Sequence, residues 1–289
     1  MKRWEHLWLF ALLLTVLTMG FAAGQQCTEV FEQAVETGSR EGITLPIIMY
    51  HSFLKDPARW GKYVIPPDQF EEDLVFLKEK GYEAITVSDL IAYVEHGTPL
   101  PDKPVMITID DGYYNNYLYA YPILQKLGMK AVISPIAGCS DQYTQSGETN
   151  AYYSHIKWNE AAQMVASGLV ELQNHSYDMH SHGDGRKGAR RMKGESPEAY
   201  REVLEDDLTR AHRTISERTG QSPTAFTYPF GGISAESGEV VRKLGYKASF
   251  SCEEGINRIT RDAECLYLLK RYNRPDQIST ADFFQKIIE

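Results

Sequence analysis

Two adjacent carboxylates are the clearest chemical feature of the chain. Asp110 and Asp111 follow the apolar run Val105–Ile109 and precede Gly112. Capping a helix needs only one aspartate, so one alternative is that Asp110 is a cap and Asp111 lies at the surface. The functional interpretation gives one carboxylate to a metal ion and leaves the other free as a general base.

Histidines supply the second feature. His175 and His180 are five residues apart after the predicted strand Val170–Gln173, and His182 follows. A lone histidine is usually structural or exposed, but this pair combined with Asp111 makes an Asp-His-His ligand set that leaves positions for water and substrate. Because the spacing does not suit one face of a straight helix, we expect both ligands on a turn. His182 is assigned no role.

Two other segments carry candidate groups at the ends of apolar runs. His51 directly follows Leu45–Tyr50, and the sequence Tyr-Pro-Phe-Gly-Gly occupies residues 228–232. This second segment is either a simple turn or a rigid loop whose backbone N–H, that of Phe230, faces the oxyanion formed during acyl transfer.

The elements that must position these groups follow a strand-helix rhythm, which is typical of a parallel sheet. The predicted strands are Leu45–Tyr50, Ala84–Val87, Val105–Ile109, Ala131–Pro135, Val170–Gln173, Ala225–Tyr228, Lys247–Phe250 and Leu266–Tyr272. The predicted helices begin at Asp68, Ser88 and Ser196 or span Tyr117–Leu127, Trp158–Ala166, Ser234–Leu244 and Ala281–Ile288. This pattern predicts an α/β fold, a distorted (β/α) barrel with about seven parallel strands in a single domain. The candidate groups should then converge at the carboxyl ends of the strands.

The N-terminus has the plan of a secretory signal. Lys2 and Arg3 precede the apolar run Leu7–Phe21 and the small residues 22–24. An uncleaved membrane anchor is the alternative, because the run is near the lower limit for spanning a bilayer. We therefore expect a signal peptide or N-terminal anchor at 1–24, a lead segment at 25–44 and a catalytic domain at 45–289, exported and either secreted or associated with the cell envelope.

Composition narrows the class of protein. The 289 residues contain 43% hydrophobic and 24% charged residues, as in a globular protein, and the formal net charge is -9. This charge argues against a nucleic acid partner. Four cysteines, Cys27, Cys139, Cys252 and Cys265, lack the spacing of a zinc cluster. Cys252 and Cys265 form a disulfide or remain free thiols.

Four motifs together resemble a known family. They are "IIMYHS", "PVMITIDDG", "NHSYDMH" and "FTYPFGG", and the likeness runs from about Leu45 to the C-terminus. The chain resembles the polysaccharide deacetylases of the chitooligosaccharide-deacetylase superfamily. It is particularly similar to the branch that includes poly-N-acetylglucosamine deacetylases, in which the catalytic histidine motif lies at the N-terminal end of the domain.

The resemblance implies a hydrolase that removes N-acetyl groups from a cell-wall or extracellular polysaccharide. It makes Asp110 the general base, His51 the general acid and Phe230 a backbone donor to the oxyanion. The metal ligands would be Asp111, His175 and His180. The implied cofactor is one divalent metal, Zn²⁺ first, with Co²⁺, Ni²⁺ and Fe²⁺ as alternatives. The implied partner is an acetylated polysaccharide, with a membrane tether through the N-terminal segment as a further option and no particular oligomeric state.

The sequence departs from the family pattern at one catalytic position. The third motif usually carries an arginine two residues before its proline, where this chain has Thr227. Arg271 is the candidate to supply that positive charge beside Asp110. Three alternatives remain open: an O-acetyl esterase, a non-sugar amidase on the same fold, and a non-catalytic glycan-binding barrel.

A basic segment follows the histidines. Residues 182–195 include Arg186, Lys187, Arg190, Arg191 and Lys193 in a chain that is acidic overall. The segment is either a solvated loop or part of a groove that attracts an anionic glycan.

Overall fold

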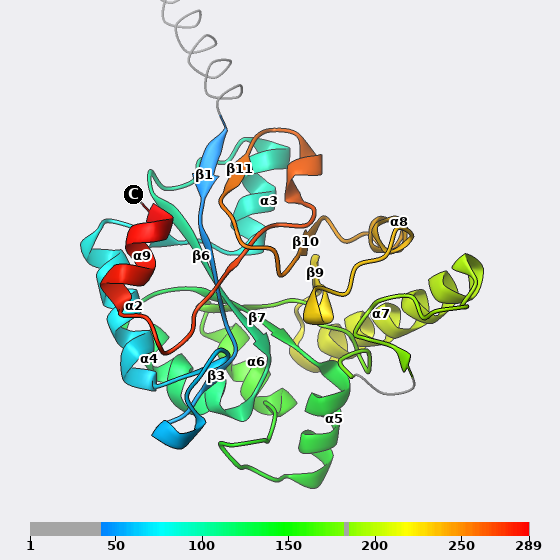
Figure 1. Ribbon diagram of the computed structural model, residues 1–289, viewed down its shortest axis with the longest axis horizontal. Coiled ribbons are helices and arrows are strands. Elements are labelled where there is room, and N and C mark those ends of the chain that lie inside the picture. Colours follow the sequence, from blue (N-terminus) through cyan, green and yellow to red (C-terminus); the bar gives the residue numbers. More distant parts are fainter. Residues whose placement is uncertain (1–41, 182–184, 289) are drawn as a thin grey trace, which may run out of the picture. The chain divides into compact units, whose positions relative to one another are not determined.

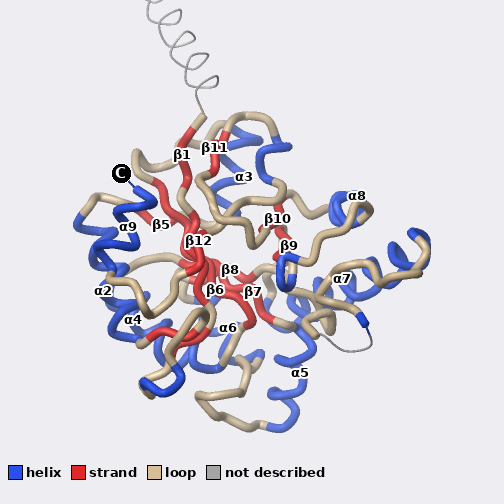
Figure 2. Tube along the Cα trace, in the orientation of Figure 1, coloured by secondary structure: helices blue, strands red, loops and turns tan. Residues whose placement is uncertain are grey.

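Short buried strands form a mostly parallel sheet at the centre of the fold (Figures 1 and 2). In the computed structural model, residues 42–181 and 185–288 are described. The hydrogen-bonded order is β12 (Tyr272–Asn273), β2 (Ile47–Tyr50), β6 (Pro104–Asp111), β7 (Ala131–Pro135) and β8 (Val170–Leu172), with β5 (Glu83–Ala84) beside β6. The predicted α/β class with a mostly parallel sheet is therefore confirmed.

The remaining strands form three pairs. They are the parallel pair β9 (Ala225–Thr227) and β10 (Ala248–Phe250), the parallel pair β3 (Ser52–Phe53) and β4 (Val64–Ile65), and the antiparallel pair β1 (Ile43–Leu45) and β11 (Asn257–Ile259). Single parallel bridges join Asn174 to Phe226 and Phe250 to Leu269. These bridges link the end of β8 to β9, and β10 to the segment before β12.

Helices pack around the sheet (Figure 1). They are α2 (Pro67–Glu79), α3 (Val87–His96), α4 (Tyr121–Leu127), α5 (Ala137–Ser146), α6 (Trp158–Ala166), α7 (Pro197–Thr219), α8 (Ser237–Lys243) and α9 (Thr280–Ile288). A π-helical turn, Asn116–Ala120, precedes α4, and 3₁₀ turns span Pro57–Arg59, Pro229–Gly231 and Ala263–Leu266. None of the helices in the described ranges is long and apolar enough to cross a membrane.

Burial on both faces of the sheet explains why the central strands have nearly continuous apolar sequences. All eight residues of β6 are buried. Ile107 and Ile109 pack into one hydrophobic cluster and Met106 into another, because successive side chains of a strand point to opposite faces. A strand covered on both sides needs apolar residues throughout, which matches the predicted pattern.

Several predicted boundaries are corrected by the structure. The run Leu45–Tyr50 divides at Pro46 into β1 and β2, since proline cannot donate a ladder hydrogen bond. The predicted strand Leu266–Tyr272 is wrong, because only its last residue belongs to a strand. Helix α5 was not predicted. The predicted starts of two helices are also wrong. Pro66 rather than Asp68 is the N-cap of α2, and Thr86 rather than Ser88 caps α3.

The structure also tests the predicted bounds of two elements, one helix cap and the state of three cysteines. The bounds of β7 and α6 agree with the expected ranges, and Ser196 caps α7 by accepting a hydrogen bond from Ala199 N at 3.1 Å. Cys139, Cys252 and Cys265 are free thiols. The predicted signal or anchor at 1–24, Cys27 and His182 lie outside the described residues.

Candidate active site

Three residues from different segments bring their potential ligand atoms together. Asp111 ends β6, and His175 and His180 follow β8. Asp111 Oδ1 lies 3.4 Å from His175 Nε2 and 3.1 Å from His180 Nε2. The candidate ligand atoms all lie within 4.8 Å of one another. The structure therefore assembles the predicted Asp-His-His set.

Asp111 provides the test of whether this set suits a cation. Its Oδ1 is buried and has no hydrogen-bond partner. A buried carboxylate oxygen without a partner is costly, and a divalent cation between the carboxylate and the two imidazoles would offset that cost. Burial raises the pKa of Asp111, but the nearby His175 and His180 rings outweigh this effect and hold the pKa well below its ordinary value. The carboxylate is thus in the form that binds a metal.

The other nitrogen of His175 is held by the backbone. Its Nδ1 lies 2.8 Å from the carbonyl oxygen of Thr227, so a proton on Nδ1 leaves Nε2 as the ligand atom. Burial lowers the pKa of His175, but Asp111 and Asp110 raise it by more. Thr227, the position where the family pattern has arginine, therefore supports a ligand through its main chain.

An irregular turn carries both histidines, as expected. Asn174 Oδ1 accepts a hydrogen bond from Ser176 N at 2.7 Å, and Ser176 has a φ of 76°. The carboxylate of Asp207, on α7, accepts hydrogen bonds from the N–H groups of Tyr177 and Asp178, both at 2.8 Å. These contacts fix a backbone conformation that a side chain would otherwise disfavour.

Asp110 lies beside Asp111 in sequence but has a different partner. Arg271 donates from Nη1 and Nη2 to the two carboxylate oxygens of Asp110 at 2.7 and 2.8 Å, and both side chains are buried. Arg271 Nε also donates to Ser251 O at 2.9 Å. Burial raises the pKa of Asp110, but Arg271, together with the nearby His175 and His51, lowers it by more, so the net shift is downward. Asp110 is therefore ionised at neutral pH.

His51 lies in the same cavity at the end of β2. Its ring centroid is 4.7 Å from that of Tyr63, and its Nδ1 is buried without a hydrogen-bond partner. Asn116 Nδ2 donates to the His51 carbonyl at 2.7 Å, which fixes the backbone. Burial lowers the pKa of His51 more than the charges of Asp111 and Asp110 raise it, so the neutral imidazole is favoured.

Phe230 lies on a strained turn at the cavity edge. It has a φ of 54° within the turn Pro229–Gly231, and its ring centroid is 4.2 Å from that of His180. A left-handed backbone at a bulky residue persists only where surrounding structure imposes it. The predicted role of its backbone N–H at an oxyanion stays a prediction.

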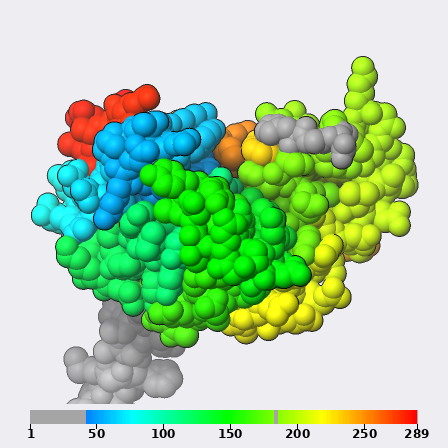
Figure 3. Space-filling view, turned by 90° about the horizontal axis from the view of Figure 1, so that it is seen from below, coloured from blue at the N-terminus to red at the C-terminus, as the bar shows by residue number. Residues whose placement is uncertain are grey.

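One cavity is lined by the candidate metal ligands together with Asp110, His51 and Phe230. Its volume is about 900 Å³, and its lining includes His51, Asp110, Asp111, His175, His180 and Phe230. Figure 3 shows segments that are distant in the sequence, blue for about 50–65 and orange for the segment after β10, close together on one face.

The sequence interpretation missed residues on the loops of this cavity. The Nδ1 of His155 lies 3.0 Å from Asp111 O, and its ring packs between Tyr113 and Tyr143. Tyr63, Tyr152 and Tyr153 line the cavity itself. No motif marks these positions, and only the pair of adjacent tyrosines was a visible signal.

The basic segment is only partly at the cavity. Arg186 pairs with Glu195, and Arg191 Nη1 lies 3.6 Å from Glu236 Oε1. Lys187 is the member of the five that lines the cavity. Two of the five basic side chains therefore form ion pairs. Arg186 pairs within the segment, and Arg191 pairs with Glu236, which precedes α8.

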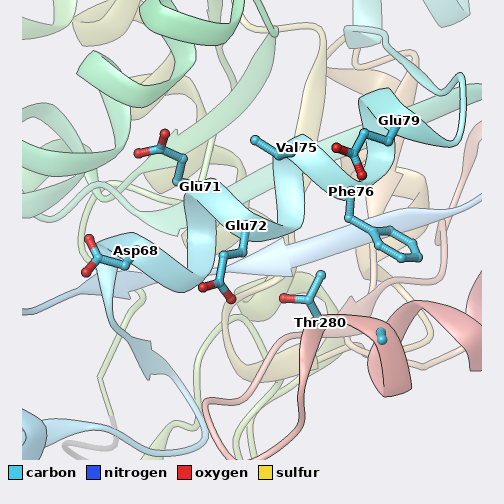
Figure 4. A pocket seen from close by; sticks show the side chains of 8 residues that line it. Asp68, Glu71, Glu72, Val75, Phe76, Glu79 and Thr280 are labelled. Atoms are coloured by element: carbon cyan, nitrogen blue, oxygen red, sulfur yellow. The ribbon is translucent and has the colours of Figure 1, made fainter.

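A second depression between α2 and α9 has a different character (Figure 4). It is lined by Asp68, Glu71, Glu72, Val75, Phe76, Glu79, Thr280 and Ala281. Its lining contains four carboxylates and no histidine or cysteine, and one of the carboxylates, that of Glu71, pairs with Lys126. The candidate metal ligands among the described residues are instead at the strand ends.

The fold and the site define an α/β protein with a candidate metal centre at the carboxyl ends of its strands. The polysaccharide deacetylase family model matches residues 97–249, more than half of the chain. The chain belongs to the polysaccharide deacetylase family, and the resemblance in the motifs is confirmed.

Curated relatives and solved structures agree with this assignment. Poly-beta-1,6-N-acetyl-D-glucosamine N-deacetylase of Escherichia coli (strain K12) is 24% identical over 259 residues, covering 83% of this chain and 38% of that protein. The protein of the same name from Staphylococcus aureus (strain MRSA252) is 27% identical over 228 residues, covering 78% and 71%. The chain thus spans less than half of the Escherichia coli relative.

Two solved structures share the fold. A de-N-acetylase from Aggregatibacter actinomycetemcomitans matches with a TM-score of 0.73 at 22% identity, covering 85% of this chain and 100% of that one. IcaB from Ammonifex degensii matches with a TM-score of 0.68 at 24% identity, covering 86% and 97%.

Proposed function

We propose that this chain is a divalent-metal-dependent hydrolase that removes N-acetyl groups from an extracellular polysaccharide. The observation that carries the proposal is the buried Asp111 Oδ1, which lacks a hydrogen-bond partner and lies between two histidine Nε2 atoms. The names of the relatives favour an acetylated amino-sugar polymer as the substrate class. Zinc is the first candidate for the ion, since a mixed carboxylate and imidazole set suits it.

Each requirement of amide hydrolysis has a candidate group. Bound at Asp111, His175 and His180, the ion would supply Lewis-acid stabilisation of the acyl oxygen. Asp110, ionised beside Arg271, would accept a proton from the attacking water. Because the lowered pKa of His51 favours the neutral ring, His51 would first take up a proton from solvent and would then donate it, as imidazolium, to the departing nitrogen. The turn at Phe230 supports a backbone donor at the oxyanion.

Arg271 acts as a positioning residue in this scheme. Its two hydrogen bonds fix both oxygens of Asp110 and keep the carboxylate ionised. The cost is a weaker base, because a lower pKa reduces proton affinity. The arginine expected at Thr227 is then replaced by one from another part of the chain.

We also propose the predicted organisation of the chain. The pairings of β2, β6, β7, β8, β9, β10 and β12, with the two single bridges, support a distorted seven-stranded barrel. The lysine-arginine start and apolar run support a signal peptide or anchor at 1–24, a lead segment at 25–44 and a catalytic domain at 45–289 of an exported protein.

Acetate release tests the proposal. The purified chain, stripped of metal and then reloaded with Zn²⁺, Co²⁺, Ni²⁺ or Fe²⁺, would be incubated with acetylated chitin oligomers, poly-N-acetylglucosamine, peptidoglycan and acetylxylan. We expect metal-dependent acetate release from an N-acetylated glycan. Release from acetylxylan alone would identify an O-acetyl esterase, and binding of glycan without release would identify a glycan-binding protein.

A further inference from the structure

The exposed aromatic side chains of the described chain gather at one place. Tyr63, Tyr152, Tyr153 and Phe230 are 48%, 51%, 49% and 37% exposed, and all four line the cavity that contains Asp111. The other exposed large hydrophobic residues are aliphatic and lie off this cavity; they are Leu118, Val203, Ile256 and Leu268. Exposed aromatic surface confined to a cavity is typical of a binding site.

The turn that carries two of these rings is fastened to the catalytic strand. Ser154 O accepts a hydrogen bond from Tyr114 N at 2.7 Å, and Gly112 O accepts one from Ile156 N at 2.8 Å. Asn115 Nδ2 donates to Ala151 O at 2.8 Å. The segment directly after Asp111 therefore holds the turn on both sides of the tyrosine pair. Rings on such a fixed turn lose little freedom when a ligand binds.

The individual rings are oriented by their own contacts. Tyr153 Oη donates to the carboxylate of Glu148. The guanidinium of Arg59 lies over the Tyr152 ring, 5.8 Å from its centroid. Arg59 belongs to the segment between β3 and β4, which also carries Tyr63 beside His51. Two separate segments thus present aromatic rings to the same space.

The space exceeds what one reacting sugar needs. A volume of about 900 Å³ is near the upper end of the roughly 300–1,000 Å³ typical of small-molecule sites. Tyrosine combines an apolar ring face, which suits the C–H face of a pyranose, with a hydroxyl that can exchange hydrogen bonds with sugar hydroxyls.

We infer that Tyr152 and Tyr153 are the residues that contact the sugar rings adjacent to the one that is deacetylated. This inference rests on the proposed function for the nature of the ligand. Recognition of neighbouring rings would come from the turn at residues 150–154, and the chemistry from the strand ends.

Binding without turnover tests the subsite. The full chain would be titrated, in the presence of a chelator that prevents acetyl removal, with β-1,6-linked N-acetylglucosamine monomer, dimer, tetramer and hexamer. We expect Tyr152→Leu and Tyr153→Leu each to weaken hexamer binding by about three- to tenfold and to leave the Kd of the monomer within error. Tyr152→Phe and Tyr153→Phe should retain most of the hexamer affinity, because the ring remains.

Leu118→Ala is the matched control, since Leu118 is 37% exposed and lies off the cavity. The inference is overturned if the leucine variants bind hexamer like the wild type, if monomer and hexamer lose affinity equally, or if the wild type binds no hexamer. Thermal unfolding of each variant verifies the fold.

Reloading the same proteins with metal separates the two proposals. Acetate release that does not depend on either tyrosine would retain the proposed function and remove the subsite. Tyrosine-dependent chain binding without acetate release from any chain would retain the subsite and remove the proposed function.

Discussion

Arg271 binds both carboxylate oxygens of Asp110 across a separation of 161 residues, at 2.7 and 2.8 Å, with both side chains buried. No other residue type fits two carboxylate oxygens with a planar fork of N–H donors in this way. The pair joins the segment before β12 to the end of β6. It thus connects the stability of the sheet to the ionisation of the proposed base.

Replacing Arg271 with Met should therefore destabilise the fold. A buried carboxylate that loses its partner typically costs about 3–5 kcal/mol, measurable as a lower free energy of unfolding in urea at neutral pH. The double variant Asp110→Asn with Arg271→Met should regain much of that loss, because no unpaired charge remains. Equal stability of the wild type and Arg271→Met would contradict the role of the pair.

The same pair predicts a pH dependence of stability. The folded pKa of Asp110 is below its ordinary value, so the unfolded state takes up protons first as the pH falls. The pair's contribution is complete above the unfolded pKa of about 3.9 and is lost as the pH falls through the folded pKa. In Arg271→Met, burial without the guanidinium raises the folded pKa of Asp110, so the difference in unfolding free energy between wild type and variant should begin to narrow above about pH 4 and continue to narrow as the pH falls further. A difference that grows with acidification would refute this assignment.

His175→Ala should remove the metal and retain the fold. The variant loses one of three ligands at a buried site, so bound metal, measured by atomic emission, should fall from about one ion per chain to near zero. Addition of metal stabilises a protein by about 2.7 kcal/mol when free metal is a hundredfold above Kd, and the resulting rise in Tm should disappear in the variant. His96→Ala, at an exposed histidine on α3, is the matched control. Unchanged metal content in His175→Ala would remove the proposed ligand set.

Asp110→Asn should separate catalysis from metal binding. Its carboxylate contacts Arg271 and is not a member of the Asp-His-His cluster. We expect wild-type metal content and a loss of kcat/KM of about 10²–10⁴-fold, the usual contribution of general-base catalysis. Glu254→Gln serves as the control, because Glu254 is another carboxylate that lines the cavity. Activity near the wild-type level in Asp110→Asn would mean that another group activates water.

Local sequence patterns were sufficient to predict the elements whose ends are set by neighbouring residues in the sequence. β7 and α6 could be bounded from sequence because apolar runs and helix periodicity end at clear stop signals. Asp111 and the histidines could be grouped because parallel strands deliver their carboxyl ends to one face. The Asp-His-His ligand set could therefore be predicted from the sequence alone.

The sequence predictions failed or were missing where tertiary contacts, rather than local residue preferences, determine the structure. Helix α5 begins after Ile136 without a side-chain cap, so no start signal marks it. The apolar run at 266–272 is interrupted by Leu268, whose φ of 58° is incompatible with a strand. His155 contacts the carbonyl oxygen of Asp111, and the tyrosine turn is held at the cavity by hydrogen bonds to the segment after Asp111. Neither sequence spacing nor composition encodes these contacts.

The basic segment at 182–195 yields a prediction that its charges are not equivalent. Lys187 lines the cavity together with Arg59 and Lys62, whereas Arg186 and Arg191 pair with Glu195 and Glu236. This positive rim contrasts with a net charge of -9 for the whole chain. Charges at a cavity concentrate oppositely charged ligands, so we expect the rim to favour an anionic glycan.

Lys187→Gln should then lower kcat/KM for an anionic polymer such as peptidoglycan by about two- to fivefold, in line with the small energies of solvent-exposed charge interactions. A neutral chitin oligomer should be little affected. Raising the ionic strength should remove the difference, because the Debye length is only about 10 Å at 0.1 M salt. Lys193→Gln is the matched control, as Lys193 is an exposed lysine of the same segment that does not line the cavity. Equal effects of the two variants, or a difference that persists in high salt, would make the segment an ordinary surface loop.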